Sequence, residues 1–234
     1  ALYAKFPRYL LPIIPSVVLL GAQLICHLWK YCRSLGRTIA GMTILVPCAR
    51  CLALVIMYLG PHPWIQASHW IQNEVPRGSV IAIEAWDHPL PIYGSANYHL
   101  VELPVFDEES PSLGRALGDT IDQADYLIIA SRRGYAALSR APARYPTAID
   151  YYTRLFNGEL GFHPVRCFAR YPVVGPFALA DQPLHSFGWN WHTMCSDFSV
   201  PTILNLGQLD ESFVVYDHPT TIVFKRASEA SQPD

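Results

Sequence analysis

The chain has 234 residues, a net charge of −2 and 51% hydrophobic residues. Its charges are unevenly divided, because residues 1–73 contain six Lys and Arg but no acid, and the first acidic residue is Glu74. The other eleven Lys and Arg and all nineteen acids give residues 74–234 a net charge of −8. This division argues against one uniform soluble domain and indicates two regions in different surroundings, one of them lipid.

Two apolar stretches near the N-terminus are long enough for membrane spans. Residues 10–29 contain no charged side chain, and residues 38–59 contain only Arg50. A helix needs about 20 apolar residues to cross the hydrocarbon core of a bilayer. We therefore expect a membrane region over residues 1–60 with two transmembrane helices, 10–29 and 38–59. The alternatives are a helical hairpin buried in a soluble core and a signal peptide, although a second span argues against the latter.

The short loop between these stretches predicts their orientation. Residues 30–37, KYCRSLGR, contain three basic side chains and no acid. Basic loops of this kind normally stay in the cytoplasm, so both outer ends of the hairpin should be extracytoplasmic. We therefore expect the chain to lie in the cell membrane with residues 61–234 outside.

Arg50 is an unusual residue for the second stretch. A buried intramembrane Arg costs at least ~2.5 kcal/mol unless it faces protein, water or a headgroup. The chain also begins at Ala1, without Met and close to a span. We therefore expect a C-terminal piece of a larger polytopic protein, whose remaining transmembrane helices are partners of this segment.

Residues 61–226 predict a small extracytoplasmic α/β domain with a mostly parallel sheet and an antiparallel end, followed by a disordered tail at 227–234. Apolar, β-branched runs predict strands and amphipathic runs predict helices. The expected helices are 62–76, 110–124 and 147–162, and the expected strands are 79–86, 98–106, 125–131, 163–172 and a final pair within 212–226. The aromatic stretch 182–209 has no clear period and predicts a long loop. Cys167 and Cys195 fall in this outer region, where an oxidising compartment would permit a disulfide, and the sequence leaves their pairing open.

The sequence contains no motif for a cofactor. It has no glycine-rich nucleotide loop after a strand and no G-x-S-x-G elbow. Two Asp-His-Pro triplets, 87–89 and 217–219, contain metal-ligand residue types, and Glu84 is near the first. Their positions favour turn chemistry over a metal site, because Asp in such turns usually accepts hydrogen bonds from the backbone. We expect no metal, no cofactor and no nucleic-acid partner.

Arg132 and Arg133 follow the third predicted strand. The carboxyl edge of an α/β sheet is where ligands bind, so this pair could contact a sugar, a phosphate or a lipid headgroup. The alternative is a solvated loop whose arginines form weak ion pairs with the acids of the domain.

Lys5, Arg8 and Tyr9 lie at the outer end of the first span. Two cations and a phenol at a membrane boundary suit an anionic headgroup or a lipid phosphate. The alternative is ordinary interfacial anchoring by these three residue types, which the residues alone do not distinguish from phosphate binding.

Several segments resemble lipid-carrier-dependent glycosyltransferases of the GT-C class, the group of the protein mannosyltransferases and aminoarabinose transferases. KFPRYLLPIIP resembles the start of a late transmembrane helix in that group. The segments HWIQNEVPRGSVIAIEAWDHPLP, ADYLIIASRRGYAALSRAPARYPTAIDYYTRLFNGELGF and DESFVVYDHPTTIVFKR resemble the tail domain of its bacterial and archaeal members. The resemblance covers nearly the whole chain, but Arg50 and the stretch 182–209 depart from the pattern.

The resemblance implies a membrane enzyme that transfers a sugar from a polyprenyl-phosphate donor to an extracytoplasmic acceptor. The catalytic Asp of the family lies in an early outer loop that has no counterpart here, so no catalytic residue is carried over. Lys5, Arg8 and Tyr9 match a basic and aromatic set near the lipid-phosphate pocket. The alternative function is a non-enzymatic, membrane-anchored binding domain.

Overall fold

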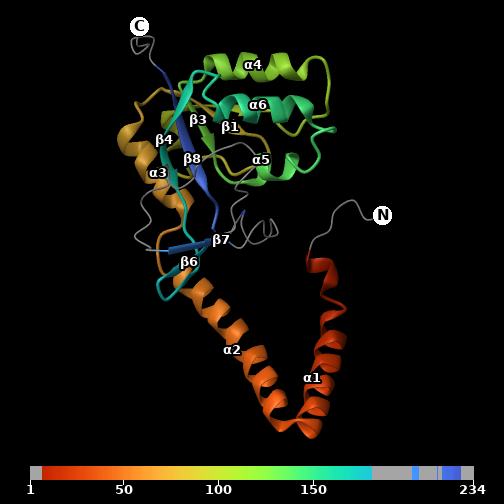
Figure 1. Cartoon of the computed structure of the whole chain (residues 1–234). Helices are drawn as coiled ribbons and strands as arrows, with labels where there is room; N and C mark the ends of the chain where they lie inside the picture. The colour runs from red at the N-terminus through yellow and green to blue at the C-terminus, as the bar shows by residue number, and fades with distance from the viewer. Residues whose placement is uncertain (1–6, 181–201, 206–214, 216–217, 228–234) are drawn as a thin grey trace.

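The computed structural model describes residues 7–180, 202–205, 215 and 218–227 (Figure 1). It begins with a short 3-10 helix, η1 (Pro7–Leu10), followed by two long helices, α1 (Ile14–Tyr31) and α2 (Arg33–Tyr58). Cys32 separates the helices because its backbone is extended, with φ −141° and ψ 95°. At the bend, Gly36 packs against the backbone of Trp29, where a Cβ atom would lie 2.5 Å from the Trp29 Cα. Only glycine allows so close a turn.

The helical hairpin exposes its apolar side chains. Within the described residues, α1 buries none of its residues, and α2 buries only Gly36, Ala53 and Met57. By length and composition, one described helical stretch, Arg33–Glu74, could cross a membrane. The other expected span, 10–29, contains helix α1 but does not meet the same criterion, so the expectation of two transmembrane helices is not confirmed. Arg50 is exposed on α2.

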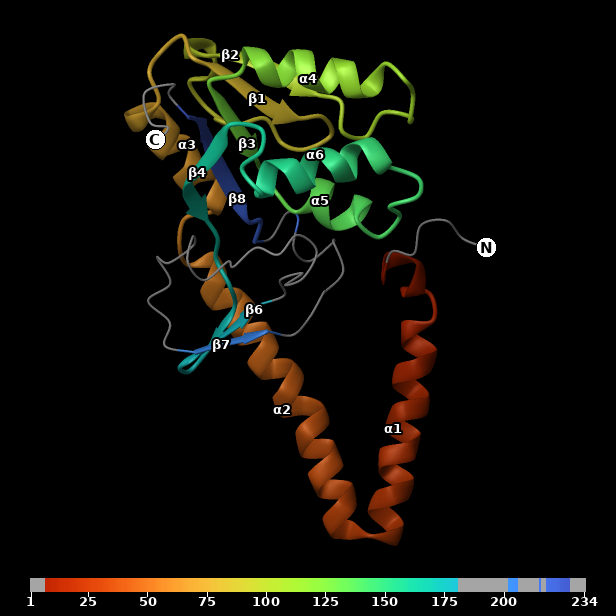
Figure 2. The same ribbon diagram turned by 45° about the horizontal axis from the view of Figure 1, so that its top comes forward.

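The outer region forms an α/β fold around a five-stranded sheet with the order β2-β1-β3-β8-β4 (Figure 2). The strands are β1 (Val80–Glu84), β2 (His99–Leu103), β3 (Tyr126–Ile129), β4 (Phe162–Phe168) and β8 (Thr221–Arg226). Strand β1 pairs in parallel with β2 and β3, whereas β8 pairs antiparallel with both β3 and β4. The sheet is therefore mixed, and the expectation of a mostly parallel sheet is not confirmed, because the last strand of the domain inserts between β3 and β4.

Helices cover both faces of this sheet. On one face, α4 (Leu113–Gln123), α5 (Arg133–Leu138) and α6 (Pro146–Phe156) enclose a core that includes Leu127, Ile129 and Phe224. On the other face, α3 (Pro63–Glu74) packs through Ala67 and Ile71. A further short 3-10 helix, η2 (Ser95–Asn97), precedes β2. Strand β3 is buried along its whole length, which explains its uninterrupted apolar sequence.

A second, three-stranded sheet lies between this fold and the helical hairpin. Its strands are β5 (Val173–Val174), β6 (Phe177–Ala180) and β7 (Thr202–Asn205), in the order β5-β6-β7. The sequence did not predict this sheet. The expectation of a loop throughout 182–209 is wrong at β7, because residues far apart in the sequence pair there in parallel with β6. The other residues of that stretch lie outside the described part of the chain, as do residues 228–234 of the expected tail.

Cys167 is buried near the end of β4 and is disulfide-bonded. Its candidate partner from the sequence, Cys195, lies outside the described residues. The other four cysteines, in the helical hairpin, are free and exposed. A disulfide in the outer region fits an oxidising compartment.

Candidate functional site

Polar side chains gather where the parallel strands β1 and β3 end. Glu84 is the last residue of β1, and Asp87 follows it by three positions. Ser131, Arg132 and Arg133 follow β3, whose register aligns Ile128 with Ile83 of β1. The two strand ends therefore bring these residues to one edge of the sheet, the edge at which α/β folds bind ligands.

A hydrogen-bonded clamp joins the two loops at this edge. The Ser131 hydroxyl donates to Asp87 Oδ2 at 2.7 Å, and it accepts from the backbone N–H of Arg133 at 3.1 Å. Asp87 Oδ1 accepts from the backbone N–H of His88 at 2.9 Å, and the Arg133 guanidinium donates to the Trp86 carbonyl oxygen. Asp87 therefore accepts a backbone hydrogen bond within its own turn, as the sequence predicts, and it accepts a second one from Ser131 in the other loop.

This clamp holds Trp86 in an uncommon conformation. Its φ is +67°, a left-handed backbone that a bulky residue rarely adopts, and its side chain is 76% exposed. Such a conformation persists where surrounding contacts determine it, and it clusters at functional sites. The clamp therefore presents an indole ring at the surface beside Arg133.

Glu84 lies beneath this surface and is almost fully buried, with 3% of its area exposed. Neither carboxylate oxygen has a hydrogen bond of standard geometry to a described residue. Burial, and after it the negative charge of Asp87, raises its pKa to about 8, and the Tyr152 hydroxyl acts in the opposite direction. Glu84 is therefore protonated at neutral pH, and it can donate a hydrogen bond or a proton.

Asp87 differs from Glu84 in its surroundings. Burial raises its pKa too, but the Ser131 hydroxyl, the His88 N–H and the positive charge of Arg133 all lower it. Two neighbouring carboxyl groups with different environments can take the roles of acid and base.

Two tyrosines of α6 border the buried acid. Burial, with the Glu84 charge as the next cause, raises the pKa of both Tyr151 and Tyr152 well above 10. Gly134 on α5 makes room for them, since a Cβ atom there would lie 1.9 Å from Tyr152 Oη and 2.9 Å from Glu84 Oε2. The strand end, α5 and α6 therefore fit together only with glycine at position 134.

Aromatic contacts place this edge beside the end of α2. The Trp64 indole N–H donates to the Ala130 carbonyl oxygen at 2.8 Å, and the Trp64 ring stacks on His88 with centroids 4.7 Å apart. Trp64 lies in the first turn of α3, a few residues after α2 ends at Tyr58. The carboxyl edge thus lies on the side of the outer domain that faces the helical hairpin.

The arginines and the N-terminal residues predicted from the sequence are found in different settings. Arg132 is buried, and Arg133 is half-buried in the clamp. Tyr9 is exposed on η1, which also contains Arg8, while the Arg8 side chain and all of Lys5 lie outside the described residues. Figures 1 and 2 show η1 at the same end of the helical hairpin as the outer domain.

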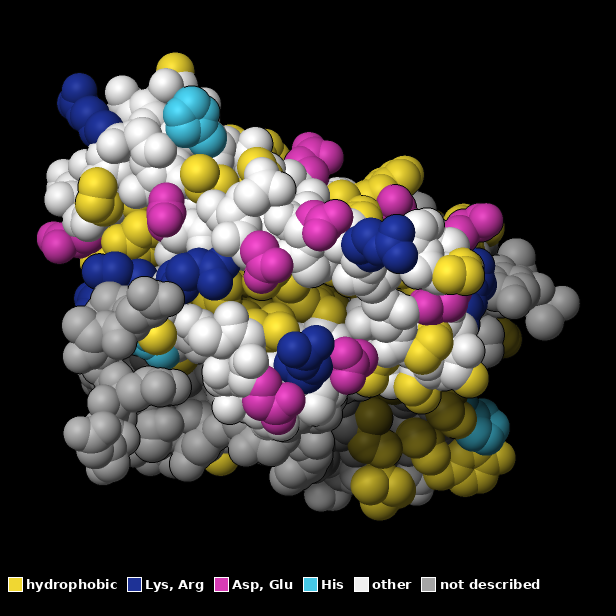
Figure 3. All heavy atoms as spheres, turned by 90° about the horizontal axis from the view of Figure 1, so that it is seen from above, with side chains coloured by type: hydrophobic (Ala, Val, Ile, Leu, Met, Phe, Trp, Pro, Cys, Tyr) yellow, Lys and Arg dark blue, Asp and Glu magenta, His cyan; other side chains and the backbone are white. Residues whose placement is uncertain are grey.

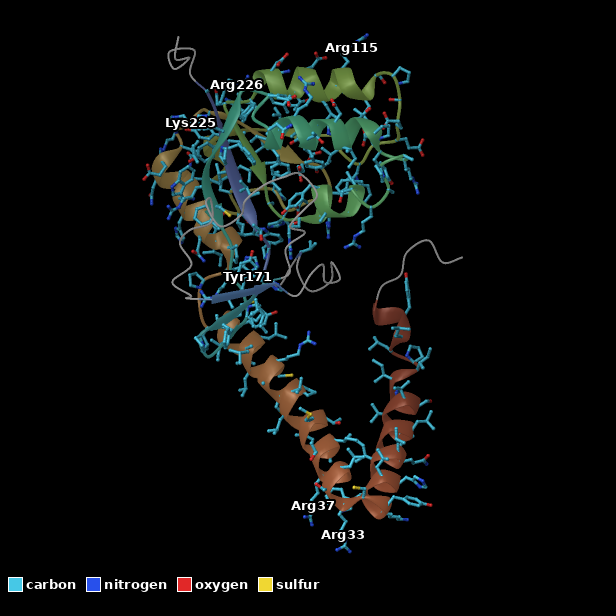
Figure 4. All side chains as sticks on the ribbon, viewed as in Figure 1. Arg33, Arg37, Arg115, Tyr171, Lys225 and Arg226 are labelled. Atoms are coloured by element: carbon cyan, nitrogen blue, oxygen red, sulfur yellow. The ribbon has the colours of Figure 1, made fainter. Side chains whose placement is uncertain are left out.

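The basic loop that was predicted to be cytoplasmic lies at the opposite end of the hairpin. Figure 4 shows Arg33 and Arg37 at the bend, far from the outer domain. The Arg37 guanidinium lies 5.9 Å from the centroid of the Trp29 ring. Basic and aromatic residues therefore lie at both ends of the hairpin, and the predicted orientation in the membrane depends on this pattern.

Sequence reasoning missed Glu84 as a buried acid and missed Ser131 and Tyr152 altogether. The only signal was a glutamate at the end of an apolar strand, VIAIE. The second triplet, 217–219, is described only in part: Asp217 lies outside the described residues, and His218 is buried. Among the described residues, no group of three or more His, Cys, Asp and Glu side chains is placed to hold a metal ion.

A recess lies between α4 and α6, on the face of the outer domain that Figure 3 shows. Its volume is about 420 Å³. Leu117, Ile121 and Leu160 give it an apolar floor, and Asp122, Asp150 and Arg154 are among its polar lining. It lies away from the helical hairpin, and Tyr151, which borders Glu84, is also part of its lining.

Comparisons of the chain with protein-family models, curated proteins and solved structures found no match.

Proposed function

We propose that this chain is the C-terminal part of an integral membrane glycosyltransferase of the GT-C class, which transfers a sugar from a polyprenyl-phosphate donor to an extracytoplasmic acceptor. In this proposal α1 and α2 are two transmembrane helices, and they pack against the remaining transmembrane helices of the parent chain and against membrane lipids. Residues 61–234 lie outside the cell membrane.

One observation carries the proposal: the apolar hairpin has its basic and aromatic start, Arg8 and Tyr9, at the same end as the outer domain. A carrier phosphate at the outer boundary of the membrane would lie between this segment and the carboxyl edge of the sheet. A departing polyprenyl phosphate gains negative charge, and fixed cations stabilise it. Lys5 and Arg8 supply those cations, and Tyr9 supplies a hydroxyl donor.

The outer domain has a separate role in this proposal. Arg133 and the exposed indole of Trp86 form a surface that suits a sugar ring or a polar acceptor, because an indole has an apolar face and a guanidinium donates hydrogen bonds. Glu84, protonated at neutral pH, lies directly below. The catalytic carboxylate of the family has no counterpart here, so this domain binds rather than supplies the main catalytic base.

The proposal is tested by photolabelling. The chain is placed in lipid nanodiscs with a photoactivatable polyprenyl phosphate, and covalent labelling is measured with and without excess unlabelled carrier. We expect labelling to fall several-fold in a Lys5→Ala, Arg8→Ala double variant. A matched double variant at the other end of the hairpin, Arg33→Ala with Arg37→Ala, should label like the wild type. Equal labelling of both variants would contradict the proposed phosphate site.

The second candidate function is a non-enzymatic, membrane-anchored binding domain. The recess between α4 and α6 favours it, because it is remote from the membrane side and open to an extracytoplasmic partner (Figure 3). This function predicts no donor labelling at all, so the same photolabelling experiment separates the two candidates.

A further inference from the structure

The β5–β6 hairpin lies against the outer half of α2. Its strands turn at Gly175 and Pro176, with Gly175 at φ +58° and Val174 paired to Phe177. Strand β5 contacts α2, whose buried residues at this end are Ala53 and Met57. Figures 1 and 2 both show the hairpin as the part of the outer region that extends furthest along α2.

The buried residues at the outer end of α2 indicate how far along the helix the outer region reaches. Ala53 lies within the apolar stretch 38–59 and six residues before its end, Leu59. At 1.5 Å per residue, this is about 9 Å along the helix axis. If 38–59 crosses the bilayer, the hairpin tip lies at the boundary between the headgroups and the acyl chains, which is where interfacial elements insert, about 5–10 Å deep.

The composition of the tip fits that depth. Residues 173–177, VVGPF, contain no charged or hydrogen-bonding side chain. Three large apolar side chains of the small sheet are exposed: Val174 at 38%, Phe177 at 39% and Leu204 at 42%. In water these side chains would leave apolar area unburied, whereas lipid would cover it.

A cation lies at the level where α2 ends. The Arg170 guanidinium packs over Gly60, where a Cβ atom would lie 1.7 Å from Arg170 Nη1. Figure 4 shows the neighbouring Tyr171 at the junction between the outer domain and α2. An apolar tip below a cation that lies at the helix end is the arrangement of an interfacial anchor.

From these observations we propose that the β5–β6 hairpin is a membrane anchor, whose tip enters the outer leaflet beside α2 and has phospholipid as its partner. The insertion is shallow, because backbone groups that enter lipid need hydrogen-bond partners within the protein. The anchor holds the outer domain with its carboxyl edge toward the membrane. This inference rests on the membrane placement of α2 in the proposed function.

The anchor is tested by site-specific photocrosslinking of the full chain in phosphatidylcholine–phosphatidylglycerol vesicles. Benzoylphenylalanine replaces one residue at a time: Phe177 in the tip, Val18 in α1, or Tyr93. Tyr93 is a matched control because its exposure, 37%, is close to that of Phe177, and it contacts the later part of α3, away from α2. Adducts are identified by mass spectrometry.

The expected result is phospholipid adducts at positions 177 and 18, with at least tenfold less lipid at position 93. Lipid at position 18 but not at position 177, or protein crosslinks at position 177, would overturn the anchor and leave the membrane placement intact. A crosslink between two copies of the chain would identify the tip as a contact between copies instead. An absence of lipid adducts at position 18 would overturn both the anchor and the proposed function.

Discussion

Replacing the buried acid changes how the stability of the outer domain depends on pH. In the folded chain the pKa of Glu84 rises from its ordinary 4.5 to about 8, chiefly through burial. Between these values the unfolded chain has lost its proton while the folded chain retains it, so the free energy of unfolding falls as pH rises. This contribution is most favourable below pH 4.5 and levels off above about pH 8. With ~1.36 kcal/mol per pKa unit, the wild type loses roughly 3–4 kcal/mol from this group between pH 5 and pH 8.

A Glu84→Gln variant cannot titrate at this position, so it should lose none of that stability. The free energies of unfolding of variant and wild type are measured by urea titration in detergent micelles, followed by tryptophan fluorescence, from pH 5 to pH 8. The stability of the variant relative to the wild type should rise steadily with pH, whatever its value at pH 5. A Glu74→Gln control at an exposed position retains Glu84, so its stability should fall with pH in parallel with that of the wild type. A constant difference between Glu84→Gln and the wild type would refute the reasoning, because it would mean that Glu84 is already ionised at neutral pH.

Three further predictions follow from the clamp, the helix contact and the basic loop. Gly134→Ala should lower the free energy of unfolding by roughly 1–3 kcal/mol, because its methyl group would overlap Tyr152. Gly118 has open space around it, so Gly118→Ala should not destabilise the fold, and urea titration compares the two variants. Asp87→Asn removes the charge of the group that accepts two hydrogen bonds in the clamp, and it should lower the free energy of unfolding by about 1–2 kcal/mol. An unchanged urea midpoint would show that the clamp does not contribute to stability. Replacing the three basic residues of loop 30–37 by Glu should reduce the fraction of chains with the outer domain outside the membrane, as measured by protease accessibility in intact cells.

The parts of the fold that the sequence predicts are those with a local pattern. Strand β3 was expected because DYLIIAS is a short, continuously apolar run, and α4 was expected from an amphipathic run with a serine and a proline at its start. The mixed sheet could not be predicted in this way. The position of β8 between β3 and β4 depends on pairing between residues almost a hundred positions apart, and no local pattern encodes that choice.

The candidate site, too, could be predicted only where a local sequence pattern exists. Arg132 and Arg133 were expected at the carboxyl edge of the sheet, because a strand end is visible in the sequence. The unusual pKa of Glu84 depends instead on burial beneath Tyr151 and Tyr152, which come from a helix more than sixty residues later. The small sheet was missed for a related reason, since β5 has only two residues and β7 arrives from a distant segment.

The most direct test of the central claim is sugar transfer by the chain within its native reading frame. Membranes that contain the protein are given a labelled polyprenyl-phosphate sugar, and consumption of the donor is followed in the wild type and in the Lys5→Ala, Arg8→Ala variant. We expect donor consumption by the wild type and a fall of at least tenfold in the variant, with equal amounts of protein in the membrane. If wild-type membranes consume no more donor than membranes that lack the protein, the glycosyltransferase proposal is contradicted.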